Sequence, residues 1–156
     1  MRSFGWLALG VIVLAGSAAL AWWQVTLPPA TRVDPKDPLV VARGQQVYDA
    51  QCASCHGKDL EGQPDWHSRL PNGRLPAPPH DATGHTWHHP SEMLFSIVKD
   101  GIVKNAPPGY ESDMPAYAGV LPDNDIRAVL SYIKSRWPED IRRRHDALDQ
   151  AVRNQR

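Results

Sequence analysis

The chain has 156 residues, 42% of them apolar, which is enough for one small domain with an appended segment but not for two compact domains. Its formal net charge is zero, yet residues 33–133 carry eight Lys and Arg against thirteen Asp and Glu, whereas residues 134–156 carry seven against four. Such an acidic body excludes a concentrated basic face, so we do not expect nucleic acid as a partner. Fifteen prolines, without alternating β-branched runs, indicate a mostly α-helical domain with long, stiff loops.

The first patterned segment carries no charge from residue 6 to residue 27. A helix over these residues would be about 33 Å long, which is enough to cross a bilayer. Trp22 and Trp23 lie where an outer aromatic belt is expected, and this favours a helix with its N-terminus inside and the rest of the chain outside. A cleaved secretory signal is the alternative, because residues 19–21 resemble a cleavage site. The apolar stretch is longer than that of a typical secretory signal, so we favour an uncleaved transmembrane anchor that comprises residues 1–28.

The folded part follows a proline-rich segment, residues 29–38, which we expect to be a stiff tether. Apolar positions from Leu39 to Ala53 predict the first helix of a domain that spans residues 39–138. Gly44 lies inside this helix, where glycine costs about 1 kcal/mol relative to alanine. We therefore expect Gly44 to mark a close approach to another helix.

The first helix leads into Cys52-Ala53-Ser54-Cys55-His56. Residues three and four apart share one face of a helix, so the two thiols and the imidazole are expected to point the same way. This spacing is typical of covalent haem c attachment, in which both sulfurs form thioethers and His56 is the proximal iron ligand. Two alternatives fit less well. A thioredoxin-like redox pair would follow a strand, and a thiolate zinc site needs more than two cysteines.

Residues 58–90 predict a long loop rich in glycine, proline and histidine, and wrapping a rigid haem would explain its length. Within it, residues 75–79 are expected to pack against the proximal haem edge. The carbonyl of Pro79, or of a neighbour, would accept the Nδ1 proton of His56, which fixes the tautomer and raises the basicity of the ligand. Three other histidines are expected to be solvated: His67, His80 and His145.

Three further histidines lie close together in the sequence at His85, His88 and His89. Neutral imidazole binds copper, zinc and iron, so this cluster is a candidate for a second metal or for another axial ligand. The interpretation we favour is a polar loop at the haem edge, leading into a short helix over residues 90–101.

The next loop, residues 105–121, contains Asp113-Met114-Pro115. Met114 lies outside any helical pattern, and nearby prolines restrict the loop, so its thioether is expected to face the iron opposite His56. Met93, in contrast, lies within a helical pattern and is expected to be a packing residue. Ligation by His56 and Met114 fills both axial positions, which predicts electron transfer rather than catalysis.

A closing helix is predicted after Pro122, because apolar residues follow at helical spacing: Ile126, Val129, Leu130 and Ile133. We expect it to cross the first helix near Gly44. Residues 139–156 predict a charged helical tail with a thin apolar stripe. The stripe would dock on the domain or on a partner, unless the tail stays solvated.

Together these residues resemble the class I monohaem cytochrome c family from about Leu39 to Trp137. The resemblance rests on four stretches: Arg43–Tyr48, Cys52–Gly57, Asp113–Pro115 and Leu121–Tyr132. It implies a mostly α-helical, cytochrome c-like domain wrapped around one covalent haem c, with His56/Met114 ligation and one-electron transfer through a partly exposed haem edge. The histidines at 85–89 and the tail after Trp137 depart from the family pattern.

Combined with the N-terminal segment, the resemblance predicts a membrane-anchored bacterial cytochrome c. We expect it to be single-pass in the inner membrane, with residues 6–27 in lipid and the haem domain on the periplasmic side. Its partners would be membrane redox proteins, which it serves as a carrier or as a subunit of a respiratory chain complex. Two alternatives remain open: a haem enzyme or gas sensor with a labile distal ligand, and a copper-handling protein that uses His85, His88 and His89.

Overall fold

The computed structural model describes residues 32–155. The expected anchor at residues 1–28, with its apolar stretch at 6–27, lies outside the described residues. Among the described helices, none combines the length and the apolar character that crossing a bilayer requires. The end of the expected tether is described, and it packs on the domain, because the backbone N–H of Asp34 donates to Ser131 Oγ at 2.9 Å.

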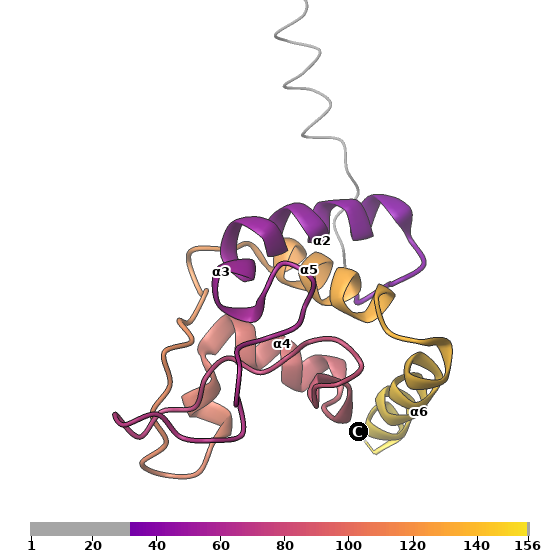
Figure 1. Cartoon of the computed structure of the whole chain (residues 1–156). Helices are drawn as coiled ribbons and strands as arrows, with labels where there is room; N and C mark the ends of the chain where they lie inside the picture. Colours follow the sequence, from indigo (N-terminus) through magenta and orange to yellow (C-terminus); the bar gives the residue numbers. More distant parts are fainter. Residues whose placement is uncertain (1–31, 156) are drawn as a thin grey trace, which may run out of the picture.

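Every regular element in residues 32–155 is helical, as the sequence predicts (Figure 1). The elements in chain order are α2 (Pro38–Gln51), α3 (Ala53–His56), the 3₁₀ turn η1 (Thr86–His88), α4 (Ser91–Asp100), the 3₁₀ turn η2 (Ile102–Asn105), α5 (Asp123–Ser135) and α6 (Glu139–Asn154). Long segments without regular structure join α3 to η1 and η2 to α5. The domain is therefore a small set of helices connected by two extended loops.

Helix α2 begins where its sequence supplies a cap. The Asp37 carboxylate accepts hydrogen bonds from the N–H groups of Leu39 at 2.9 Å and Val40 at 3.3 Å, and Pro38 occupies the first turn. A proline is tolerated there because its missing N–H would have no partner inside the helix. The cap fixes the start of the helix that leads into the Cys52–His56 motif at its other end.

Helices α2 and α5 pack against each other (Figure 1). Their backbones come closest at Gly44, which confirms the expected close approach. A Cβ at residue 44 would overlap the carbonyl group of Ala128 and lie 2.9 Å from the Cβ of Tyr132. The crossing is reinforced at its edge by Arg43, whose guanidinium pairs with the Asp125 carboxylate at 2.6 Å and 2.8 Å. The absent side chain lets the two backbones touch, and this contact sets the geometry of the core.

The core between these helices continues into the segment that follows α3. Tyr48 and Val129 are almost fully buried, and the Tyr48 ring lies 5.4 Å from that of Tyr132. Leu60, from the long loop, is 1% exposed and belongs to the same cluster. Its backbone carbonyl accepts the N–H of His80 at 2.8 Å. The first long loop is therefore tied to the helical core rather than lying loosely on the surface.

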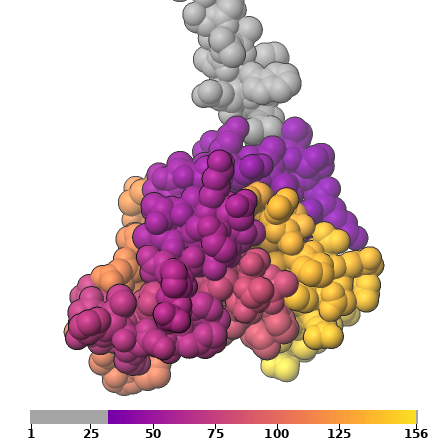
Figure 2. Space-filling view, in the orientation of Figure 1, coloured from indigo at the N-terminus to yellow at the C-terminus, as the bar shows by residue number. Residues whose placement is uncertain are grey.

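Helix α6 is the charged helical tail that the sequence predicts, and it packs against the domain. It packs on the domain through Ile141, 8% exposed, and His145, 1% exposed, while Leu148 and Val152 are half-buried. Asp149 accepts both the N–H and the hydroxyl of Ser91, each at 2.7 Å. In the space-filling view, the yellow atoms of α6 lie against the pink atoms of α4 (Figure 2). The alternative of a solvated tail is wrong.

Candidate haem site

The attachment motif lies on a helical corner rather than on one continuous helix. Helix α2 ends at Gln51, Cys52 caps it, and α3 starts at Ala53. The N–H groups of Cys55 and His56 nevertheless bond the Cys52 carbonyl at 3.1 Å and 2.9 Å. These bonds preserve the helical spacing, so the three chemical groups stay within one turn. Gly57, at φ 80°, then ends the helix.

The two thiols are in different surroundings. Cys52 is partly buried beside the main core, whereas Cys55 is exposed. Burial, and then the neighbouring Cys55 thiol, raise the pKa of Cys52 to about 11. A thioredoxin-like redox pair would follow a strand, whereas helix α2 precedes this motif, so that alternative does not fit.

His56 is held in the orientation that an iron ligand requires. It is 8% exposed, and its Nδ1 bonds the carbonyl of Pro78 at 2.9 Å. Burial lowers the pKa of His56, with the bond to Pro78 opposing, so the ring is neutral at pH 7. With the proton on Nδ1, the lone pair of Nε2 is left for a metal.

The carbonyl that accepts from His56 therefore lies within residues 75–79, as expected, but it belongs to Pro78 and not to Pro79. The Pro79 carbonyl lies instead against Gly84, where a Cβ would overlap it, and 3.5 Å from the hydroxyl of Thr86. Consecutive prolines look alike in the sequence. Which carbonyl faces His56 depends on how the loop turns around Gly84.

Tyr48 was not among the predicted site residues. Its hydroxyl donates to the carbonyl of Gly57 at 2.8 Å, just past the end of α3. Burial is the main cause that raises the pKa of Tyr48. The side chain therefore stays a neutral donor that fixes the end of the motif to α2. An aromatic residue that precedes the first cysteine by one helical turn is the signal that could have found it.

His80 was expected to be solvated, and this is wrong. Its ring stacks on the His56 ring with centroids 4.0 Å apart and planes at 24°. Its Nδ1 bonds Thr86 Oγ1 at 2.7 Å. Burial, followed by the neighbouring His56 and His85, holds the pKa of His80 well below its usual range. His80 is thus a neutral ring placed against the proximal ligand.

Met114 lies half-buried in the loop between η2 and α5. On one side of it, Asp113 and Glu111 pair with Arg74 from the first long loop. On the other side, the Tyr117 hydroxyl donates to the carbonyl of Gln51 at 2.8 Å, directly before the motif. The loop is therefore fixed both to Arg74 of the first long loop and to the end of α2. Arg74 and Tyr117 were not predicted from the sequence.

In the described part of the chain, the ring nitrogens of the three histidines at 85–89 are not gathered into a group of three ligands. The rings of His85 and His89 lie 5.5 Å apart, edge to face, and His88 stacks on Trp87. Within residues 32–155, three potential ligands come within 4.8 Å of one another only at His145, Asp146 and Asp149. The favoured interpretation, a polar loop before α4, describes the arrangement best.

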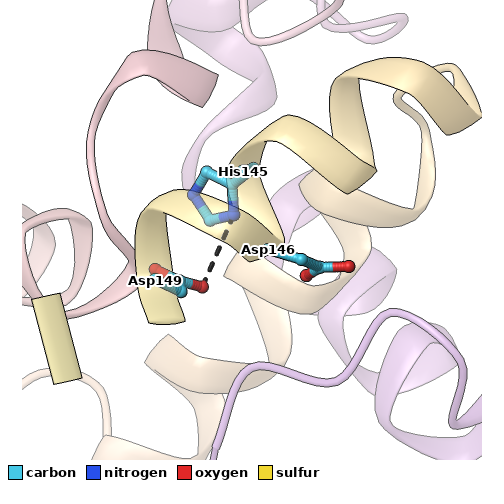
Figure 3. Close-up of side chains that lie close together, drawn as sticks. All are labelled: His145, Asp146 and Asp149. Atoms are coloured by element: carbon cyan, nitrogen blue, oxygen red, sulfur yellow. Dashed lines mark ion pairs between the residues drawn. The ribbon is translucent and has the colours of Figure 1, made fainter. Parts of the chain in front are cut away.

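That group of three residues lies on α6 (Figure 3). Lys134 of α5, 4% exposed, already places its ammonium 2.6 Å from Asp146 and 3.5 Å from Asp149. A cation bound there would displace this ammonium and leave it buried without a counterion, which is strongly unfavourable. The cluster is an ion-pair network that joins α6 to the domain.

Comparison with known proteins agrees with this geometry. Residues 41–137 match the cytochrome c family, and the chain belongs to that family. It is 34% identical over 67 residues to cytochrome c-555 of Prosthecochloris aestuarii, covering 39% of this chain and 68% of that protein. It is 30% identical over 90 residues to cytochrome c6 of Gracilaria tenuistipitata var. liui, and the match covers 58% of this chain and 67% of that protein.

A third relative is the cbb3-type cytochrome c oxidase subunit FixPc of Rhizobium leguminosarum bv. viciae. The identity is 28% over 101 residues, covering 65% of this chain but only 29% of that longer protein. No solved structure is a significant match.

The residues present fit the covalent haem c that the family implies. Two thiols and a neutral imidazole lie within one helical turn, and the imidazole already has the carbonyl partner that orients a metal ligand. When bound, haem c supplies a one-electron iron couple. The chain is thus a cytochrome c electron carrier, and it has the cysteine pair, Cys52 and Cys55, that covalent attachment of haem c would use.

Proposed function

We propose that this protein is a membrane-tethered one-electron carrier whose haem iron is ligated by His56 and Met114. The observation that carries the proposal is the double anchoring of the Met114 loop. Arg74 holds Asp113, one residue before the methionine, and Tyr117, three residues after it, bonds the end of α2. A loop fixed at both ends positions its thioether with little freedom, as a permanent axial ligand requires.

Each part of the site then has a defined role. Cys52 and Cys55 would hold the cofactor covalently, and His56 would offer Nε2 to the iron while the Pro78 carbonyl accepts its Nδ1 proton. Met114 would offer its sulfur, which favours the reduced state relative to stronger donors. With both residues as ligands, the chain would leave no position on the iron for an exogenous ligand. This separates an electron carrier from a gas sensor or a haem enzyme.

The ligation is tested by replacing Met114 with leucine. The wild-type ferric protein should show the weak far-red band of sulfur–iron ligation, and the ferrous protein should not bind carbon monoxide. Met114→Leu should lose the band, acquire carbon monoxide binding and have a changed reduction potential. The matched control is Met93→Leu, a half-buried methionine on α4. Carbon monoxide binding by the wild type, or a far-red band kept by Met114→Leu, would contradict the proposal.

The proposed tether is the uncharged stretch at residues 6–27. We place the protein in the bacterial inner membrane, with the haem domain on the periplasmic side, because a segment of this length can span a bilayer. The test is fractionation of cells that express the full chain, followed by intact mass measurement. Haem protein that sediments with membranes, resists alkaline extraction and retains residues 1–28 supports the anchor. A periplasmic protein that starts after residue 28 would show a cleaved signal instead.

We propose membrane redox proteins as partners. A tether raises the effective concentration of the carrier near other membrane proteins, so weak and rapidly reversible docking is sufficient. The relative from Rhizobium is, by its name, a subunit of a cbb3-type oxidase, and a respiratory complex is a partner consistent with that similarity. Chemical crosslinking in native membranes, followed by mass spectrometry, tests this. Crosslinks restricted to soluble proteins would refute it.

A further inference from the structure

His80 and Trp137 connect the proximal ligand to the C-terminal part of the fold. The His80 imidazole covers one face of the His56 ring. The backbone carbonyl of His80 accepts the indole N–H of Trp137 at 2.7 Å, and Trp137 is 3% exposed at the end of the family-matched region. The ligand is therefore in contact with the corner between α5 and α6 through one intermediate residue.

The hydrogen bond to Pro78 does not by itself fix the His56 ring. One N–H···O bond leaves the ring free to rotate about the line that joins the donor to the acceptor. A flat group against one face removes that rotation, because turning the ring would collide with it. The His80 ring, 4.0 Å away and nearly parallel, is such a group.

His80 can do this because its own ring is fixed. Its Nδ1 bonds Thr86 Oγ1 at 2.7 Å, and Thr86 is 5% exposed. Its backbone is held at both polar atoms, by Leu60 at the N–H and by Trp137 at the carbonyl. An aliphatic side chain at residue 80 would fill the space without a bond to Thr86 and without a plane to impose.

Helix α6 holds the other end of the same segment. The Nε2 of His145 lies 2.9 Å from the carbonyl of His89, and the His145 ring packs edge-on to Trp137 with centroids 5.0 Å apart. Residues 80–89 are thus held at their first residue by Trp137 and at their last by His145. Helix α6 lies beyond the region that matches the family, so this support belongs to this chain's own extension.

We propose that His80 is a positioning residue for the proximal haem ligand, fixing the plane of the His56 imidazole, and that the α5–α6 corner fixes His80. This inference rests on the proposed function, because it assigns His56 to the iron. Its consequence is electronic. The bond from His56 to Pro78 stays well aligned only while the ring is held, and that bond makes the ligand more basic and favours the oxidised iron.

The test uses the holoprotein and two variants. His80→Leu removes the flat ring, and Thr86→Val keeps the ring but removes the partner of its Nδ1. The readouts are the haem-methyl resonances in the proton NMR spectrum of the ferric protein, which depend on the plane of the axial imidazole, and the reduction potential. His80→Leu should redistribute the methyl shifts and raise the potential. Thr86→Val should change both in the same sense but less.

The matched control is His88→Leu, the same chemical change at an exposed ring of the same loop that stacks on Trp87. It should leave both readouts at wild-type values. Unchanged methyl shifts and potential in folded His80→Leu would overturn the proposal, as would an equal change in His88→Leu. If His80→Leu fails to fold, Thr86→Val decides in the same way.

The haem content of each protein separates this proposal from the proposed function. Covalent haem with the far-red sulfur band, but unchanged methyl shifts in His80→Leu, refutes the positioning role alone. A wild type without covalent haem refutes both.

Discussion

The hydroxyl of Tyr117 donates a 2.8 Å hydrogen bond to the carbonyl of Gln51, the residue directly before Cys52. This contact joins the loop of the proposed distal ligand to the start of the attachment motif. The Tyr117 side chain is 8% exposed, and burial is the main cause that raises the pKa of Tyr117. The hydroxyl therefore remains a neutral donor, and the two halves of the site are linked through it.

Tyr117→Phe keeps the ring and removes the donor. We expect it to lower the free energy of unfolding by about 1 kcal/mol, the usual net value of a single hydrogen bond. We also expect ferric haem in this variant to bind added imidazole more tightly, because the Met114 loop is less restrained. Urea unfolding and imidazole titration measure these effects. Tyr110→Phe is the control, since the Tyr110 hydroxyl has no hydrogen-bond partner within residues 32–155, and equal effects there would argue against the link.

Gly44→Ala tests the helix crossing. Alanine in a helix would normally stabilise by about 1 kcal/mol relative to glycine. Here its Cβ would overlap the carbonyl group of Ala128, so we expect a net destabilisation of roughly 1–3 kcal/mol, as for other overpacked cores. Urea unfolding monitored by far-UV circular dichroism measures it. Gln45→Ala, at an exposed position of the same helix, should change the stability by less than about 0.5 kcal/mol. Stabilisation by Gly44→Ala would show that the two backbones do not touch.

Asp149→Ala tests how α6 is attached. The substitution removes the acceptor of both Ser91 groups and one of the two carboxylates that pair with buried Lys134. Because these groups are left with fewer partners, the free energy of unfolding should fall by about 2–4 kcal/mol. The control is Asp140→Ala on the same helix, whose partner Arg144 is 3.8 Å away at the surface, and it should cost less than about 0.5 kcal/mol. If Asp149→Ala lowers the free energy of unfolding no more than Asp140→Ala does, the network contributes little to stability.

His145 predicts a pH dependence of stability. It faces Lys134 of α5, Asp146 and Asp149 of α6 and the carbonyl of His89. Burial first, and then the Lys134 charge, lower the pKa of His145 below its ordinary 6.5. At pH values between the pKa of His145 in the folded protein and 6.5, His145 binds a proton in the unfolded chain but not in the native state. Stability should therefore fall as the pH drops below about 6.5.

His145→Gln separates this contribution from that of the other histidines. Glutamine does not titrate and keeps an N–H donor for the His89 carbonyl, so its unfolding free energy should depend less steeply on pH than that of the wild type. The measurement is urea unfolding at several values between about pH 5 and pH 7. Identical slopes in the two proteins would show that His145 does not titrate on unfolding.

The parts of this fold that the sequence predicts are those that depend on local spacing. The attachment motif requires only that Cys52, Cys55 and His56 lie within one helical turn. The crossing at Gly44 follows from an otherwise unfavourable residue inside a helix. Even there, the break between α2 and α3 at Cys52 was missed, because both sides of it have helical backbone angles.

The parts that could not be predicted depend on partners far away in the chain. His80 and His145 were expected to be solvated, yet His80 accepts the Trp137 N–H and His145 bonds the carbonyl of His89. The thin apolar stripe of helix α6 left three outcomes open, which were docking on the domain, docking on a partner and a solvated tail. It could not decide between them because Asp149 and His145 supply much of the attachment through polar bonds. No periodicity encodes such contacts. The choice of Pro78 over Pro79 likewise depends on the path of the loop.

The ion pairs of buried Lys134 limit how far the chain can be truncated at its C-terminus. Its side chain is 4% exposed, and both carboxylates that pair with its ammonium, Asp146 and Asp149, lie past the last residue that matches the family. A fragment that stops at Trp137, as the family boundary suggests, would lose both counterions together with Ile141, which belongs to the main core. We therefore expect α6 to be needed for full stability, and recombinant versions trimmed to the family boundary should have a lower free energy of unfolding.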